Sequence, residues 1–237
     1  MKTAVVVFPG SNCDRDVQRA VSESMKTDVD MVWHEEENFS GQPDLVILPG
    51  GFSYGDYLRS GAMAARSPII KAVKEHAARG GLVLGICNGF QILTETKMLP
   101  GALLPNTSLT FICSRCYVRV EQTDNKFTSG LKKGEVLQFP IAHHEGLFFL
   151  PDDELKKLEN AGRIVFRYAD PDTGKAGEEY APNGALNGIA GICSEKGNIL
   201  GLMPHPERAT IPHLSSGTDG IRFWDSIAKA FKERGAC

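Results

Sequence analysis

The stretch around Cys87 has the pattern of a nucleophile held on a sharp turn. A buried, strand-like run (LVLGI) leads into Gly-Ile-Cys-Asn-Gly, and a helical pattern follows. Gly85 and Gly89 leave room for a tight crossing of strand and helix. At a helix N-terminus the dipole favours a thiolate, and the Asn88 N–H can stabilise an oxyanion. A lone cysteine in an apolar run is usually structural, but this context predicts that Cys87 attacks a carbonyl.

A candidate base for Cys87 lies far downstream. A buried run (ILGLM) ends at Pro204, and His205 is followed by Pro206 and Glu207. The two prolines restrict the backbone, which suits a rigidly placed imidazole. Glu207 can accept a hydrogen bond from one ring nitrogen and fix the tautomer. An isolated His-x-Glu is usually a strand-end histidine beside a solvated acid, but together with the cysteine turn it predicts a base and its orienting group.

A third loop, Pro49-Gly50-Gly51, follows another buried run (DLVIL). Ligand sites of open α/β sheets lie at the carboxyl ends of parallel strands. The Gly51 N–H is therefore a candidate second oxyanion donor. The alternative is a loop that merely needs a positive φ.

Length, charge and cysteine usage limit the remaining possibilities. The chain has 237 residues, with 26 Lys+Arg against 29 Asp+Glu and a net charge of −3. Such a near-neutral chain is not typical of nucleic-acid binders, and no apolar run reaches the roughly 18 residues of a membrane span. Its six widely spaced cysteines favour free thiols in a reducing compartment. We therefore expect a cytoplasmic protein.

The elements that must position these residues predict an α/β fold. In the first half, short apolar runs alternate with amphipathic segments, which is typical of an open, mostly parallel central sheet covered by helices on both faces. The second half is richer in strands, and antiparallel additions are expected there. Its candidate strands are 109–121, 136–142, 163–168, 188–193 and 199–203, with a final helix at about 219–234. The whole chain, 1–237, is predicted to be a single domain.

Together, three segments resemble the class I, triad-type glutamine amidotransferases. The matching pieces are Leu48-Pro49-Gly50-Gly51, Gly85-Ile86-Cys87-Asn88-Gly89-Phe90-Gln91 and Pro204-His205-Pro206-Glu207. The resemblance implies that Cys87 attacks the side-chain amide of glutamine and forms a glutamyl thioester. It implies that His205 shuttles the proton and that Glu207 orients His205. Gln91 and Gly50 would contact the substrate, and Gly51 and Asn88 would form the oxyanion hole.

Longer segments are similar to one family, the small glutaminase subunits (PurQ) of phosphoribosylformylglycinamidine (FGAM) synthase. These segments are 51–62, 106–121, 140–146 and 183–208, so the resemblance covers essentially the whole chain. It implies that glutamine is hydrolysed and that ammonia passes to a synthetase converting formylglycinamide ribonucleotide (FGAR) to FGAM in purine biosynthesis. One departure is His144, which stands where the family's Ala-His-Gly-Glu-Gly has glycine.

The resemblance also implies partners. The chain has neither a P-loop nor a Gly-x-Gly-x-x-Gly fingerprint, so no cofactor is expected on it. Mg-ATP would be used by the large synthetase subunit PurL, with the small subunit PurS bridging the complex. We expect Tyr54, Asp56, Tyr57 and Arg59 to lie at or near the docking face. The alternative is a loop that packs on its own chain.

Two pairs of residues lie outside the triad motifs, namely Cys113 with Cys116 and His143 with His144. Cys113 and Cys116 form a lone Cys-x-x-Cys inside an apparent strand, where an offset of three puts the sulfurs on opposite faces. No metal site is therefore predicted. His143 and His144 follow a strand-like run and either line the pocket or form a polar strand end.

Two other functions remain open at this stage. A free-standing Cys-His-Glu hydrolase, of peptidase or γ-glutamyl hydrolase type, would share the cysteine turn but act without a synthetase. A non-catalytic, partner-binding subunit would keep the fold, although the retained Cys87, His205 and Glu207 argue against it.

Overall fold

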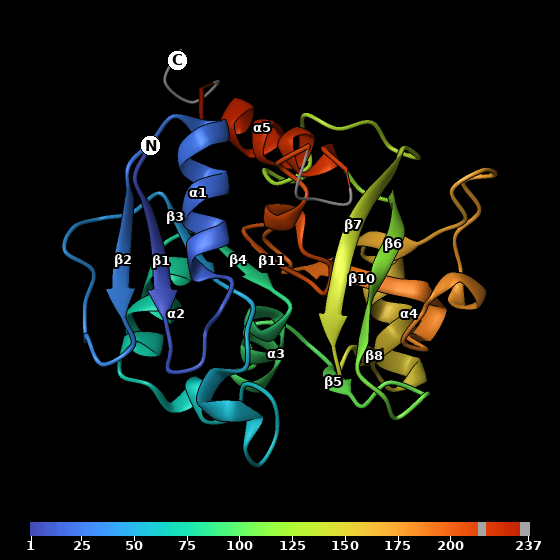
Figure 1. Cartoon of the computed structure of the whole chain (residues 1–237), viewed down its shortest axis with the longest axis horizontal. Coiled ribbons are helices and arrows are strands. Elements are labelled where there is room, and N and C mark those ends of the chain that lie inside the picture. The colour runs from blue at the N-terminus through green and yellow to red at the C-terminus, as the bar shows by residue number, and fades with distance from the viewer. Residues whose placement is uncertain (213–216, 233–237) are drawn as a thin grey trace.

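The computed structural model describes residues 1–212 and 217–232, in which most strands join one large sheet (Figure 1). The strands of this sheet are β1 (Thr3–Val7), β2 (Val29–Trp33), β3 (Leu45–Leu48), β4 (Leu82–Ile86), β6 (Ile112–Val120), β7 (Val136–His143), β9 (Ile164–Tyr168), β10 (Ile189–Cys193) and β11 (Ile199–Leu202). Their spatial order is β2-β1-β3-β4-β11-β10-β9-β6-β7. A separate pair joins β5 (Ala102–Leu104) to β8 (Leu147–Phe149).

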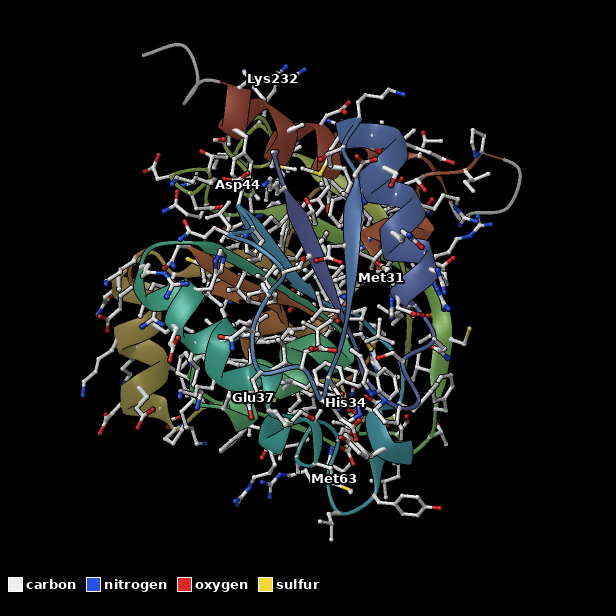
Figure 2. All side chains as sticks on the ribbon, turned by 90° about the vertical axis from the view of Figure 1, so that its left-hand side faces the viewer. Met31, His34, Glu37, Asp44, Met63 and Lys232 are labelled. Carbon is white, nitrogen blue, oxygen red and sulfur yellow. The ribbon has the colours of Figure 1, made fainter. Side chains whose placement is uncertain are left out.

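The helices follow the apolar periodicity of the sequence. They are α1 (Asp14–Met25), α2 (Ile69–Ala78), α3 (Asn88–Glu95), α4 (Asp152–Asn160) and α5 (Asp219–Lys232). Short 3-10 turns, η1 to η5, lie at Ser53–Asp56, Ala64–Arg66, Glu178–Tyr180, Leu186–Gly188 and Pro206–Arg208. Figure 2 views the sheet from the edge formed by β2, near the labelled Met31 and His34. In this view α1 and α2 lie on opposite sides of the strands.

The half of the sheet from β2 to β11 is parallel, because each of its four neighbouring pairs runs in the same direction. Every residue of β3, β4 and β11 is buried. Continuous burial follows from helices covering both faces, and it explains why these strands read as unbroken apolar runs. The predicted parallel core is confirmed.

The other half, from β11 through β10, β9 and β6 to β7, is antiparallel throughout. Burial along β7 alternates strictly, as expected of a strand with one face on the core. The antiparallel additions predicted for the second half are therefore confirmed. That one domain spans residues 1–237 stays a prediction.

Three elements differ from the sequence expectations. Strand β2 was not predicted, because it is an edge strand with one fully buried residue, Val32, and no continuous apolar run. The charged residues at 152–154 and 156–157 are compatible with a solvated loop or a helix start, and the structure extends them into the helix α4, Asp152–Asn160. Helix α5 was expected to about residue 234, but residues 233 and 234 lie outside those the structure describes. Within the described ranges, no helix combines the length and apolar character needed to cross a membrane.

Candidate active site

Cys87 lies between β4 and α3, with φ 50° and ψ −105°. Residues other than glycine rarely adopt this backbone conformation. Its N–H donates to Leu202 O of the neighbouring strand at 2.8 Å. A Cβ on Gly89 would lie 1.9 Å from Leu48 O, and one on Gly85 would lie 2.6 Å from Gly89 O. Both glycines are therefore required by the close crossing of strand and helix, which forces the strained turn at Cys87.

The structure pairs His205 and Glu207 as predicted. His205 follows β11, and Glu207 lies in η5, the 3-10 turn that begins with Pro206. Their side chains are fully enclosed, and His205 Nδ1 lies 2.6 Å from Glu207 Oε1. Since a carboxylate only accepts, Nδ1 carries the proton. The other ring nitrogen, Nε2, has no hydrogen-bond partner among the residues that the structure describes.

Taken together, nearby negative charge and hydrogen bonds have a larger effect on the pKa of His205 than burial has. Burial alone would lower the pKa of His205, but the Glu207 carboxylate and the neighbouring Cys87 raise that pKa well above its usual value. An imidazolium is thus the stabilised form of His205, and it lies beside Cys87.

The edge strand β7 forms one wall of the site, although it belongs to the antiparallel half. Pro140 O accepts a hydrogen bond from the His205 N–H at 2.9 Å. Cys87 Sγ lies 3.8 Å from Ala142 O, so the thiol rests against β7. Pro140 has no N–H to donate, which suits a strand whose outer edge faces the site rather than another strand.

A polar network connects the first turn of α3 to two loops. The Asn88 amide donates to Gln91 Oε1 at 2.9 Å and to Asp56 Oδ1 at 3.3 Å, and its oxygen accepts from the Ser53 N–H. Gln91 Nε2 donates to Glu145 O at 2.6 Å. The two predicted residues of α3 are therefore anchored to the loop after β3 and to the loop after β7.

Gly50 and Gly51 lie on different sides of the same loop. Gly50 faces the histidine, since a Cβ there would lie 2.7 Å from His205 Cε1 and 3.2 Å from Cys13 Sγ. Gly51 has φ 140° and forms an isolated β-bridge with Ser11. A Cβ on Gly51 would lie 2.7 Å from Asn12 N, so glycine is required by both conformation and space.

The four residues predicted for a docking face differ in exposure. Tyr57 is exposed, but the Tyr54 hydroxyl lies 2.9 Å from His34 Nδ1 and turns inward. Arg59 forms a fork to Glu95 of α3, with Nε 2.7 Å from Oε1. Three of the four residues therefore have partners on their own chain, as the alternative of a self-packed loop expects. Their role in docking stays a prediction.

The cysteine and histidine pairs also separate in the structure. Cys113 is exposed and Cys116 is buried, in keeping with opposite faces of β6. His143 is buried, with Nδ1 3.2 Å from Asn106 Oδ1, whereas His144 is exposed. His144 does not have a positive φ, so a side chain is tolerated where the family has glycine.

Cys13 was not singled out by the sequence analysis. It is buried at the N-terminus of α1. Its Sγ lies within 4.8 Å of a ring nitrogen of His205 and of a carboxylate oxygen of Glu207. These three residues are spaced closely enough to hold a metal ion. A metal on Nδ1 and Oε1 would first have to part the 2.6 Å hydrogen bond between them. The sequence signal that could have found Cys13 was its place in the short segment between the first strand and the first helix.

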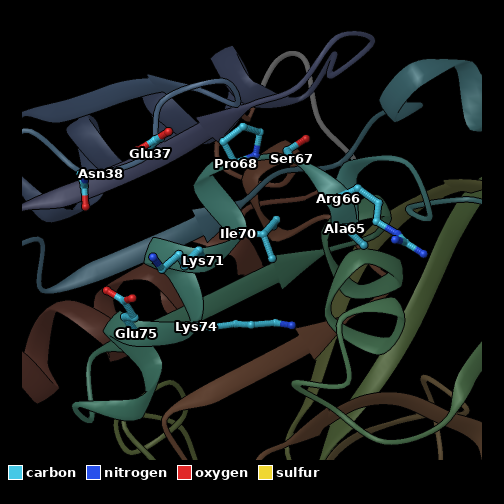
Figure 3. A pocket seen from close by; sticks show the side chains of 10 residues that line it. All are labelled: Glu37, Asn38, Ala65, Arg66, Ser67, Pro68, Ile70, Lys71, Lys74 and Glu75. Atoms are coloured by element: carbon cyan, nitrogen blue, oxygen red, sulfur yellow. The ribbon is translucent and has the colours of Figure 1, made fainter.

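A large surface hollow lies elsewhere, between α2 and the segment after β2 (Figure 3). Its volume is about 670 Å³, and its lining includes Arg66, Lys71 and Lys74 together with Glu37 and Glu75. None of the predicted site residues lines it. This hollow is therefore separate from the enclosed Cys87 and His205.

Comparisons with known proteins agree with this geometry. The profile of the CobB/CobQ-like glutamine amidotransferase domain matches residues 1–227. Phosphoribosylformylglycinamidine synthase subunit PurQ of Aquifex aeolicus is 51% identical over 227 residues, covering 96% of this chain and 99% of that protein. The same subunit of a Synechococcus strain (JA-2-3B'a(2-13)) is 54% identical, covering 98% of each chain. The chain belongs to the PurQ family of glutamine amidotransferases.

Solved structures agree in fold. A structure of PurLQS from Thermotoga maritima matches with a TM-score of 0.84 and 42% identity, covering 97% of this chain and 98% of that one. The glutaminase domain of a Trypanosoma brucei CTPS matches with a TM-score of 0.62 at 14% identity, which is a likeness of fold alone. The PurQ resemblance and the predicted α/β fold are thereby confirmed.

Proposed function

We propose that this PurQ-family chain is the glutaminase subunit of an FGAM synthase, with Cys87 as nucleophile. The observation that carries the proposal is the enclosed His205–Glu207 pair, which leaves Nε2 as the one unpartnered ring nitrogen beside a strained cysteine. The Cys87 thiolate attacks the side-chain amide carbon of glutamine. His205 Nε2 then protonates the leaving nitrogen, so ammonia departs and a glutamyl thioester remains.

Water completes the cycle. Neutral His205 Nε2 takes a proton from the water that attacks the thioester carbon, glutamate leaves, and the thiolate–imidazolium pair is restored. In this proposal Glu207 orients the ring and stabilises its charge. The N–H groups of Gly51 and Asn88 hold the oxyanion, and Gln91 and Gly50 contact the substrate.

The proposal places ATP chemistry on a partner. Ammonia released here would pass to a PurL-type synthetase, which would use Mg-ATP to convert FGAR to FGAM, with a PurS-type subunit bridging the two. No cofactor is required on this chain, and the complex would be cytoplasmic. Exposed apolar side chains near the site support docking, since Tyr57 and Leu58 protrude and the rings of Phe52 and Phe111 contact each other nearby.

The test is glutamate release from glutamine by the chain alone and by the chain with PurL, PurS, Mg-ATP and FGAR. We expect a large increase on assembly and loss of both activities in Cys87→Ala, with Cys193→Ala as a matched buried-thiol control. Equal activity in the two conditions would contradict the coupled subunit and indicate a free-standing hydrolase. Failure of a glutamine-analogue electrophile to label Cys87 would instead indicate a non-catalytic subunit.

A further inference from the structure

The imidazole of His205 is enclosed along one edge by three different groups. Glu207 Oε1 holds Nδ1, and the absence of a side chain on Gly50 makes room for Cε1. Cys13 Sγ lies along the same edge, within 4.8 Å of a ring nitrogen of His205 and of a carboxylate oxygen of Glu207. The ring is therefore held along its Nδ1–Cε1 edge, which leaves Nε2 as the nitrogen that can exchange a proton.

Cys13 is itself rigidly placed. Its N–H donates to Gly50 O at 3.3 Å, its carbonyl accepts from the Val17 N–H within α1, and its Sγ lies 3.2 Å from Asn12 Oδ1. Only 1% of its surface is exposed. Burial raises the pKa of the Cys13 thiol, so it stays neutral and does not compete with Cys87 as a nucleophile.

A second contact ties the same helix to the same turn. Arg208 Nε donates to Asp16 Oδ2 at 3.2 Å, which joins η5 to the first turn of α1. The start of α1 and the turn that carries Glu207 therefore form one packed unit. Within that unit, Glu207 Oε2 is buried and has no hydrogen-bond partner among the described residues, whereas Oε1 is hydrogen-bonded to His205 Nδ1.

We propose that Cys13 is a positioning residue for His205: its neutral thiol fixes the imidazole edge and leaves the Glu207 charge directed at Nδ1. A thiol is a weak hydrogen-bond donor, whereas a hydroxyl in the same place is a stronger donor that would compete with the imidazole for the Glu207 carboxylate. The residue type thus determines how much of that charge stabilises the imidazolium. The inference rests on the proposed glutaminase function.

The test compares Cys13→Ala and Cys13→Ser with Cys193→Ser, a control at another buried thiol. Glutamate release by the assembled complex gives kcat and KM for glutamine. Alkylation of Cys87 by iodoacetamide across pH, followed by peptide mapping, gives the pH midpoint of thiolate formation. Thermal unfolding of each variant separates loss of positioning from loss of folded protein.

For Cys13→Ala we expect kcat to fall about tenfold with KM nearly unchanged, because a loosened base misaligns the proton transfer. For Cys13→Ser we expect the midpoint of Cys87 alkylation to move to higher pH, because the hydroxyl takes up part of the Glu207 charge. The control should show neither change.

Two results would overturn the inference. One is that both Cys13 variants match Cys193→Ser in kcat and in alkylation midpoint. The other is that activity falls only in proportion to folded protein while the midpoint stays fixed, which is a purely structural role. Failure of the proposed function is distinguishable, since wild-type protein would then release no glutamate while its alkylation midpoint still reports on Cys13.

Discussion

The turn at Cys87 and the loop at 52–60 lie on the same site but are built differently. At the turn, every residue of β4 and nearly every residue of α3 is buried, and the strained cysteine is held by the backbone packing of two glycines. In the loop, Tyr54, Asp56 and Leu58 have positive φ without being glycine, and Leu58 is 93% exposed. The proposed nucleophile is thus positioned by the core, whereas the loop depends on the contacts of its own side chains.

The sharpest way to break the turn is Gly89→Ala. Its new Cβ would meet Leu48 O at 1.9 Å, and neither the strand nor the helix can shift without disturbing the core. We expect the free energy of unfolding in urea to fall by about 3 kcal/mol or more and glutaminase activity to disappear. Gly41→Ala is the control, because nothing lies within 4 Å of a Cβ there. A stable, active Gly89→Ala protein would show that the turn is not held by packing.

The loop is tested by Leu58→Asp. If this exposed side chain contacts the synthetase, a charge there should reduce the activation of glutamate release on assembly by about tenfold, and activity of the chain alone should persist. Leu104→Asp, at another exposed leucine on β5, serves as the control. Unchanged activation in Leu58→Asp would place the docking face elsewhere and leave the loop as part of its own chain's packing.

The smallest expected effect concerns Asp56. Burial, followed by the charge of Glu145, raises the pKa of Asp56 from 3.8 to about 6. The folded state therefore binds this proton more tightly than the unfolded state, and the stability it contributes is lost as pH rises towards 6. Asp56→Asn should raise the melting temperature at pH 7.5 and raise it less at pH 4.

The control for this effect is Asp28→Asn, at an exposed acid outside the site. A lower melting temperature for Asp56→Asn at pH 7.5 would show that ionised Asp56 stabilises the loop through its contact with Asn88. In that case the loop, like the turn, would be held in place by contacts within its own chain.

The turn and the loop also differ in how far the sequence predicts them. Gly85, Cys87 and Gly89 are neighbours in the chain, so their shared purpose is visible as a local pattern. The pairing of His205 with Glu207 is visible for the same reason. The positive φ angles of Tyr54 and Leu58 are not, because these residue types normally avoid that region and only tertiary contacts impose it.

Long-range contacts were equally hidden. Cys13 lies beside the imidazole of His205, and Pro140 O accepts a hydrogen bond from the backbone N–H of His205. Both contacts join segments far apart in the sequence, so no local pattern encodes them. Strand β2 was missed because Asp30 interrupts its short apolar run and, at the edge of the sheet, most of its residues are not buried. The parallel core and the pairing of His205 with Glu207 were predictable, whereas the contacts of Cys13 and Pro140 with His205 were not.

The scatter of the site along the chain has a consequence during synthesis. Cys13, Cys87, Pro140 and His205 meet only when segments from the beginning and the far end of the sequence are packed together. A nascent chain that has emerged as far as β7 carries the nucleophile but has neither its base nor its orienting acid. The proposed glutaminase therefore stays inactive until the segment that carries His205 and Glu207 has been synthesised and packed against Cys87.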